Sequence, residues 1–527
     1  MGTPFLLVGG LTAILACALI AKRAALPYPI VFVLAGLGLA FVPGLPAIRL
    51  DPQYIFVVVL PPLLFSGGWQ TDWRIFRTYL RPISLLAIGL VVATTLVTAV
   101  VAHALGLPWV AGFVLGAIIS PPDAVAAMTI FERFQMPRRV TAIVDGEGLV
   151  NDGAALVIYQ FAVLAAVTGV FAPLHAAATF VYVVVAGIAF GFLNGFAVEG
   201  IARLTRRFAL DDSLIDNLVF LIAPYAAYAS AQAAGASGVL SAVVAGVLVS
   251  RRSAAIYGPE TRLVGASVWS VLLYLINGFA FLTIGLQVRD FFAESALAER
   301  AIVPGLIISA AAVLLRIGWV FTTVYLPRAL FPHWRGFAPR PPWRWVSVVA
   351  WSGLRGIVSL AAALALPFTD HLGRPFVARD VIIVITFVVI LVTLVGQGLM
   401  LIPLLRWLRL SEDDDPTDVR DLEVRIAALQ AGLAAIERLE LGVHSPHEAE
   451  IIGRIKSEYE NRISHLRAHT GNGQDENPLA RFDHELQAAA LSAEREAITR
   501  MRDDGKIPDD IFRAIQFDLD LAASRLT

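Results

Sequence analysis

The sequence predicts an all-α polytopic membrane protein, and three observations predict this fold class. Of the 527 residues, 57% are hydrophobic and only 16% are charged, and the mean hydropathy is +0.72. Apolar runs recur at close to the roughly 20 residues that a transmembrane helix needs. The charges are also divided, because residues 411–527 carry 25 Asp and Glu against 14 Lys and Arg, whereas residues 1–410 carry 17 against 27. A basic membrane part, 1–410, followed by an acidic tail, 411–527, is therefore expected.

The membrane part contains thirteen apolar segments, and the basic residues between them predict the topology. With the N-terminus outside, the inner loops hold 20 Lys and Arg and the outer loops only five, which is the bias that the positive-inside rule requires. We therefore expect thirteen transmembrane helices with the C-terminal tail in the cytoplasm. The segments are 4–21, 28–42, 52–68, 82–104, 108–130, 140–167, 174–199, 213–233, 237–250, 263–288, 301–327, 344–368 and 379–404.

Composition and motifs exclude several other classes of protein. The single cysteine, Cys17, excludes an internal disulfide framework and a Cys-rich metal site. A Gly-rich phosphate loop and a metal-ligand spacing of histidines are both missing from the sequence. We therefore expect no cofactor, no enzyme activity and no nucleic-acid partner. The first apolar run, Pro4–Ala21, lacks a basic segment before it and is expected to be retained rather than cleaved.

The stretch Val144–Asp152 places several polar groups in one otherwise apolar segment. Asp145, Glu147 and Asp152 lie in it, with Asn151 beside the last. Spacings of four and seven residues put these groups on roughly one side of a helix. Ionisable side chains at membrane depth usually face a protein interior or a water-filled path. The stretch indicates a functional site, although a buried structural network would show the same pattern.

Two further segments are expected to be interrupted helices. In the fifth, Pro121 and Pro122 remove backbone donors at mid-membrane, and Asp123 follows directly. The free carbonyls of such a break, together with this carboxylate, suit a hard monovalent cation. In the twelfth segment, Gly353 and Gly356 flank a charged residue and weaken the helix. Interrupted helices at matching positions are typical of transporters built from inverted repeats, whereas a kink near the membrane surface is the alternative.

The twelfth segment carries Arg355, which keeps its proton and so needs an anion in the membrane. Glu147 is the expected partner, and an ion pair of this kind would be structural. Asp152 has no such neighbour, and burial favours the protonated form of an isolated carboxyl. Protonation and cation binding at Asp152 would then be alternatives, which is sufficient to couple two opposite fluxes.

The remaining intramembrane polar residues carry weaker signals. We expect the amides of Asn277, Gln287 and Gln397 to form hydrogen bonds between helices, and Arg316 to snorkel or to pair locally. Pro61-Pro62 should break or kink the third segment.

In the tail, an acidic break at 412–416 precedes amphipathic stretches at 417–441, 446–468, 481–503 and 508–525, with a turn signal at 471–473.

The dispersed motifs together resemble the cation/proton antiporter-1 family of sodium/proton exchangers. They are LPPLLF at 60–65, SPPDAVA at 120–126, GEGLVND at 146–152, NGFAFLTIGLQ at 277–287 and GLRGIVSLAAALALP at 353–367. They occur in the family's order and span residues 1–410. The resemblance implies a homodimer in the lipid bilayer of a cell membrane, here the bacterial inner membrane. It also implies inverted repeats, a mobile core of helices 82–167 and 301–404, and dimerisation helices 4–68 and 174–288.

The resemblance also implies roles for individual residues. Asp152 would bind the ion and the proton, and Asn151 is its partner in an Asn-Asp motif that accompanies electroneutral exchange. Asp123 would lie beside the site in the broken-helix motif, and Glu147 and Arg355 match the family's buried ion pair. The transported species would be protons and sodium, with lithium and potassium left open. Two departures from the family's pattern leave the choice of cation open. Gly148 lies where family members commonly have serine, and Ser66 lies where they often have an acidic residue.

Two other classes of function are weighed against a proton-coupled antiporter. A cation channel, or a sensor of ions or pH with a regulatory tail, is the alternative. An intramembrane aspartyl hydrolase using Asp123 and Asp152 is disfavoured, because a proline break places the first and an asparagine adjoins the second.

Overall fold

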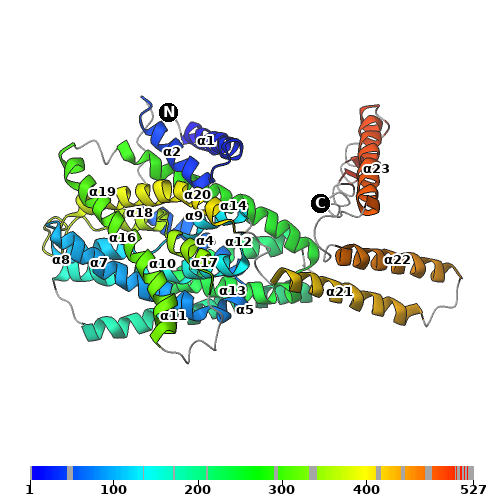
Figure 1. Ribbon diagram of the computed structural model, residues 1–527, viewed down its shortest axis with the longest axis horizontal. Helices are drawn as coiled ribbons and strands as arrows, with labels where there is room; N and C mark the ends of the chain where they lie inside the picture. The colour runs from blue at the N-terminus through cyan, green and yellow to red at the C-terminus, as the bar shows by residue number, and fades with distance from the viewer. Residues whose placement is uncertain are drawn as a thin grey trace. The chain divides into compact units, whose positions relative to one another are not determined.

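In the computed structural model the regular elements are helices (Figure 1). The structure describes residues 3–43, 52–134, 136–169, 173–208, 212–289, 295–330, 341–410, 417–440, 446–468, 478–504, 506, 511–512, 515–516 and 519. The chain divides into two compact units, Met1–Asp414 and Asp415–Thr527. The acidic break at 412–416, the turn signal at 471–473 and most of the stretch 508–525 lie outside the described residues.

The first unit holds helices α1 to α20. Their bounds are α1 (Thr3–Ala24), α2 (Tyr28–Ala40), α3 (Pro52–Tyr54), α4 (Leu60–Gln70), α5 (Trp73–Thr78), α6 (Leu80–Ser84), α7 (Val91–Ala104), α8 (Trp109–Ile119), α9 (Ala124–Arg133), α10 (Arg138–Thr168), α11 (Pro173–Arg207), α12 (Ser213–Ala233), α13 (Gly238–Ile256), α14 (Pro259–Leu286), α16 (Ser295–Leu330), α17 (Trp343–Trp351), α18 (Ile357–Leu364), α19 (Arg379–Ile390) and α20 (Gly398–Leu408). Three π-helical segments, η1 (Ile55–Val59), η2 (Leu85–Leu90) and η4 (Leu391–Gln397), connect neighbouring helices.

Each of the thirteen apolar segments of the sequence contains helix in the structure. Among the described residues, nine helices or joined helices are long and apolar enough to cross a membrane, and Tyr28–Ala40 is a shorter apolar helix. The all-helical, multi-span fold class is therefore confirmed. The count of thirteen spans and the orientation of the termini stay predictions.

The expected irregularity at Pro61-Pro62 takes the form of a π-helical turn. Segment η1 ends at Val59, and α4 then begins at Leu60 with the two prolines in its first turn. A proline has no amide hydrogen and its ring clashes with the preceding turn, so the widened turn before it accommodates both defects. The helix axis continues without a break of the kind found at Pro121-Pro122.

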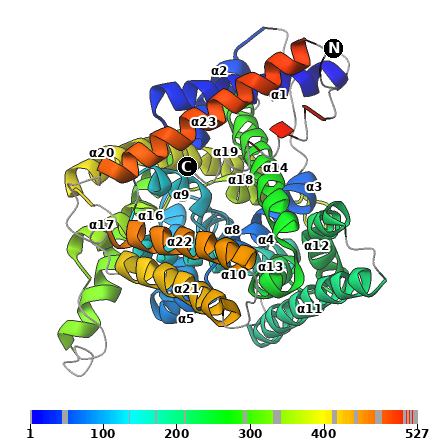
Figure 2. The same cartoon turned by 90° about the vertical axis from the view of Figure 1, so that its right-hand side faces the viewer.

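Glycines allow several helices of this unit to pack at backbone distance. A Cβ on Gly36 of α2 would lie 2.1 Å from the carbonyl oxygen of Leu282, and a Cβ on Gly285 of α14 would lie 2.2 Å from that of Val33. The same reciprocal contact joins α4 to α13. Helices α11, α12 and α13 also pack together in one group (Figure 2). Close approach through small residues is a common way to associate helices in membranes.

The second unit contains α21 (Thr417–Glu440), α22 (Pro446–Ala468) and α23 (Pro478–Asp503), which correspond to the first three amphipathic stretches. Helices α21 and α22 lie side by side (Figure 1). A Cβ on Gly432 of α21 would lie 2.7 Å from the ring of Tyr459 in α22. Lys456 Nζ lies 3.7 Å from Glu437 Oε1 across this pair. The tail thus folds at least partly on itself.

The Gly36 contact yields a test of the packing. We expect Gly36→Ala to destabilise the protein by about 1–3 kcal/mol, because the added methyl group meets fixed backbone. Thermal unfolding of the purified protein in detergent measures this. Gly38→Ala is the matched control, since a Cβ on Gly38 of the same helix meets no atom within 4 Å. Equal unfolding temperatures for the two variants would contradict this account of the α2–α14 contact.

Candidate functional site

The two interrupted helices expected from the sequence are present, and their breaks meet. Helix α8 ends at Ile119 and α9 begins at Ala124, while α17 ends at Trp351 and α18 begins at Ile357. The backbone amide of Asp123 donates a hydrogen bond to the carbonyl of Leu354 at 2.7 Å. This bond joins segments more than 200 residues apart in the sequence.

Gly356 permits this crossing because it has no side chain. A Cβ at this position would lie 1.6 Å from Asp123 Oδ2. Similarly, a Cβ on Gly353 would lie 2.3 Å from Cδ of Arg316. Gly356 therefore leaves room for Asp123, and Gly353 leaves room for Arg316. This role is more specific than the weakening of the helix that the sequence suggested.

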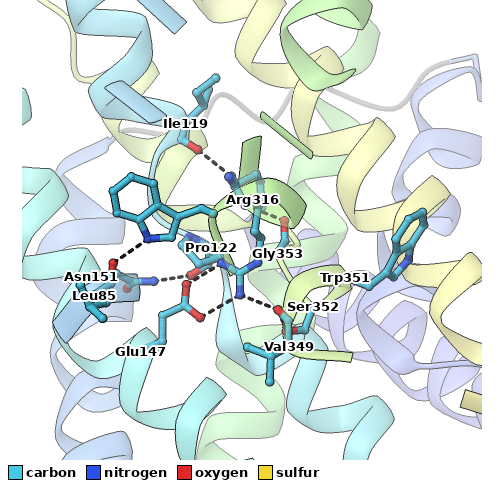
Figure 3. A network of polar contacts seen from close by, with 12 residues as sticks. Leu85, Ile119, Pro122, Glu147, Asn151, Arg316, Val349, Trp351, Ser352 and Gly353 are labelled. Atoms are coloured by element: carbon cyan, nitrogen blue, oxygen red, sulfur yellow. Dashed lines mark hydrogen bonds and ion pairs between the residues drawn. The ribbon is translucent and has the colours of Figure 1, made fainter. Parts of the chain in front are cut away.

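Pro121 and Pro122 lie in the first break. The side chain of Asn151 in α10 forms a hydrogen bond with the backbone of this break. The Asn151 amide nitrogen donates to the Pro122 carbonyl at 3.0 Å (Figure 3). The Asn151 side chain is fully buried, and among the described residues its amide oxygen has no hydrogen-bond partner. Asn151 thus fixes α10 next to the point where the backbone has lost its helical bonds.

The carboxylate of Asp123 caps helix α9. Its Oδ1 accepts hydrogen bonds from the amides of Val125 at 2.9 Å and Ala126 at 3.5 Å. Its Oδ2 lies beside Gly356, which is the N-cap of α18. A carboxylate between two helix N-termini is stabilised by their free amides and by the helix dipoles. Asp123 is therefore held in a fixed position where the two breaks meet.

A cavity of about 100 Å³ opens next to the crossing. Helices α4, α9, α10, α14 and α18 and the two breaks contribute to its wall. Its polar lining consists of three carboxyl groups, one amide and one hydroxyl, from Asp123, Asp145, Asp152, Asn277 and Ser359. The volume is enough for a few water molecules or a partly hydrated ion.

Asp145 and Asp152 face this cavity from the same side of α10, as their seven-residue spacing predicts. The hydroxyl of Thr71 approaches Asp145 Oδ2 at 3.4 Å, beyond the usual O–H···O range. Within the described part of the chain, no hydrogen bond or ion pair reaches the carboxyl group of Asp152. Asp152 is thus an intramembrane carboxyl group that the protein leaves accessible from the cavity.

The buried ion pair of Glu147 differs from the expected one. Arg316 Nη1 lies 2.5 Å from Glu147 Oε1, and Nη2 lies 2.8 Å from Oε2 (Figure 3). Arg316 also donates to the Val349 carbonyl at 3.0 Å, and both charged side chains are at most 2% exposed. The prediction that Glu147 pairs with Arg355 was therefore wrong, as was the prediction that Arg316 snorkels or pairs locally.

The guanidinium of Arg355 is bound by backbone carbonyls instead of a carboxylate. Its Nε donates to Ile119 at 2.6 Å and its Nη1 to Gly353 at 2.5 Å. Ile119 is the last residue of α8, and the C-terminal end of a helix carries a partial negative charge. The carbonyls of the two breaks thus bind the guanidinium that was expected to pair with Glu147.

The other polar predictions have mixed outcomes. Gln397 forms the expected bond between helices, since its amide nitrogen donates to the Trp351 carbonyl at 2.5 Å. Asn277 lines the cavity instead of lying only between helices. Ser66 is buried and accepts a hydrogen bond from Gln70 at 3.0 Å. At Gly148, a Cβ would lie 2.4 Å from Cβ of Ala124, so α9 packs directly against α10 there.

The fold and the site together define the class of protein. A multi-span helical bundle with two crossing interrupted helices and intramembrane carboxyl groups around a small cavity is typical of secondary ion transporters.

Comparison with known proteins identifies the family. The family model described as "Sodium/hydrogen exchanger, transmembrane" matches residues 10–407, and the chain belongs to this family. The chain is therefore a cation/proton antiporter of the multi-pass membrane class.

Individual relatives agree with this assignment. An uncharacterized Na⁺/H⁺ exchanger of Mycobacterium bovis is 32% identical over 509 residues, covering 94% of this chain and 91% of the relative. A sodium, potassium, lithium and rubidium/H⁺ antiporter of Bacillus pumilus is 31% identical, covering 88% of this chain and 69% of the relative. The structure of the sodium proton antiporter of Methanocaldococcus jannaschii at pH 8 aligns with a TM-score of 0.59 at 18% identity, covering 77% of this chain and all of that one.

The buried ion pair leads to a prediction about stability. Arg316→Ala should cost about 3–5 kcal/mol, because it leaves the Glu147 carboxylate buried without a partner. Thermal unfolding and the yield of folded protein after size-exclusion chromatography measure this loss.

A double variant serves as the control for that prediction. Removing both charges, as in Glu147→Leu with Arg316→Met, should restore most of the stability, since a buried pair is often replaceable by apolar groups. A stable Arg316→Ala protein, or a double variant no better than the single one, would contradict the assignment of this pair.

Proposed function

We propose that the protein exchanges sodium for protons at Asp152, with lithium and potassium as further possible cargo. The observation that supports this most directly is the state of Asp152, a carboxyl group on a cavity wall that no described residue binds. Either a proton or a cation can neutralise it there. One carboxyl group that carries the two in turn couples inward flux of one to outward flux of the other.

Two of the neighbouring charged groups have fixed partners. Of the two cavity carboxyl groups that remain, the Thr71 hydroxyl approaches Asp145 and no described donor reaches Asp152, and we assign this role to Asp152. Glu147 is bound by both terminal nitrogens of Arg316, and Asp123 is bound by the amides of α9. A proton or a cation at Glu147 would have to displace Arg316, and one at Oδ1 of Asp123 would compete with the α9 amides. Asn151 has no charge to exchange. We therefore infer that a single carboxyl group alternates between its two forms.

Electroneutral exchange follows from this division of roles. Whether it binds a proton or a monovalent cation, Asp152 has the same net charge, so each direction of transport moves equal charge. We propose that the charges of Asp123, Asp145, Glu147, Arg316 and Arg355 stay constant during the cycle. We propose a stoichiometry of one cation for one proton on this basis.

Alternating access requires that the cavity open to either side in turn. Its lining comes from one group of helices, α9, α10 and α18, and from a second group, α4 and α14. We propose that the first group belongs to a core, helices 82–167 and 301–404, that moves like an elevator against dimerisation helices 4–68 and 174–288. The same proposal includes a homodimer in a bacterial inner membrane, with the N-terminus outside and the tail in the cytoplasm.

The choice of cargo is supported by the chemistry of the cavity and by relatives. Hard monovalent cations prefer oxygen ligands, and carboxyl, amide and hydroxyl oxygens line the cavity. The relative from Bacillus pumilus is named for sodium, potassium, lithium and rubidium. We place sodium first and expect the same site to accept lithium and potassium with different affinities.

Removal of the alternating carboxyl group tests the proposed function. Asp152→Asn should abolish sodium-driven proton flux in proteoliposomes, because an amide can neither release a proton nor neutralise a cation. A pH-sensitive dye inside the vesicles measures this flux.

The matched control for that experiment is Asp72→Asn. Asp72 caps helix α5 at the surface, and asparagine caps equally well, so this variant loses the same charge away from the cavity. It should exchange at the rate of the wild type. Normal exchange by a folded Asp152→Asn protein would refute the assignment, and cation current without proton counterflow in the wild type would indicate a channel.

A further inference from the structure

The cavity offers a cation fewer backbone oxygens than a broken helix would suggest. The carbonyls of Ile119 and Gly353 already accept from Arg355, that of Pro122 accepts from Asn151, and that of Leu354 accepts from Asp123. Within the described ranges, no three His, Cys, Asp or Glu side chains form a group that could hold a metal ion. Neutral side-chain oxygens are therefore the further ligands to look for around a dehydrated cation at Asp152.

Ser359 presents such an oxygen. It lies in the first turn of α18, lines the cavity together with Asp123 and Asp152, and is only 1% exposed. Among the described residues its hydroxyl has no hydrogen-bond partner. A buried hydroxyl without a partner is rare in native proteins and calls for an explanation, such as a bound ion or water.

The position of Ser359 near the start of α18 explains why no backbone carbonyl of this helix accepts a hydrogen bond from its hydroxyl. A helical serine often donates to the carbonyl four residues earlier, as Ser309 of α16 does to Gly305 at 2.6 Å. For Ser359 that residue is Arg355, which lies in the break before α18 begins. The hydroxyl of this cavity-lining residue is thus left buried without an acceptor in its own helix.

Two other positions around the cavity supply no free hydroxyl, so the neutral side-chain oxygens besides Ser359 are the amide oxygens of Asn277, which lines the cavity, and of Asn151, which has no partner among the described residues. Gly148 also lines the cavity but has no side chain, and a Cβ there would meet Ala124 at 2.4 Å. Ser66 is buried nearby in α4 and is bound by Gln70. The hydroxyl oxygen of Ser359 has two lone pairs and can coordinate a cation without adding charge to the site.

We propose that the hydroxyl of Ser359 is a ligand of the transported cation, acting together with the carboxylate of Asp152. This inference rests on the proposed antiport. It makes Ser359 a determinant of cation affinity and of selectivity among sodium, lithium and potassium. A proton on Asp152 needs no such ligand, so Ser359 favours the cation-bound form over the protonated one.

The test compares variants of Ser359 in proteoliposomes, with sodium, lithium and potassium as separate substrates. Ser359→Ala should raise KM for the preferred cation by about three- to tenfold, which is the contribution of one neutral polar contact. The maximal rate at saturating cation should stay within about twofold of the wild type, because the carboxyl chemistry is intact. The ratio of the three KM values should also change. Ser359→Thr keeps the hydroxyl and should keep KM near the wild-type value.

Ser309→Ala is the matched control, since it removes a buried hydroxyl that already has a partner outside the cavity. It should leave all three KM values unchanged. A wild-type KM for every cation in Ser359→Ala would overturn the proposal and indicate that the hydroxyl binds only water. An equal rise in KM in Ser309→Ala would overturn it as well. If the wild type exchanges normally in these experiments, the proposed antiport stands independently of either result.

Discussion

The rest of the structure depends on the crossing of two broken helices inside the membrane part. The amide of Asp123 binds the carbonyl of Leu354, and Gly356 lies against the Asp123 carboxylate without room for a side chain. A broken helix leaves backbone groups unpaired, which is tolerated in a membrane only where protein or water covers them. Here each break supplies partners for the other. The same arrangement places carboxyl groups, helix ends and a small cavity at one point.

The crossing also distributes the charges of the site. Arg355 donates to the carbonyls of Ile119, at the end of α8, and of Gly353, while Glu147 binds Arg316. Asp123 is bound by the amides that begin α9. Each of these charges has a fixed partner, as the high cost of an unpaired buried charge requires. Asp145 and Asp152 are the cavity carboxyl groups without such a partner, and the proposed exchange places the mobile proton or cation on Asp152.

Much of the fold and part of the site were predictable from the sequence, since some features have local causes. Pro121-Pro122 and Gly353 with Gly356 indicated the two interruptions, because proline and glycine act on their own backbone. The pairing of Glu147 was not predictable in this way. It depends on Arg316, 169 residues away, and sequence spacing gives no distance between two such helices. From the sequence, Gly353 and Gly356 were expected to weaken the helix around Arg355. In the structure they leave room for Arg316 and Asp123 instead.

The measurement that tests the central claim most directly is proton release when the purified protein binds its cation. In a weakly buffered detergent solution, addition of sodium to the wild type should release about one proton per cation bound, because ligand carboxyl groups must lose their protons. Asp152→Asn should release none. Saturable sodium binding without proton release, or equal release by Asp152→Asn, would contradict the account of one carboxyl group shared by the two ions.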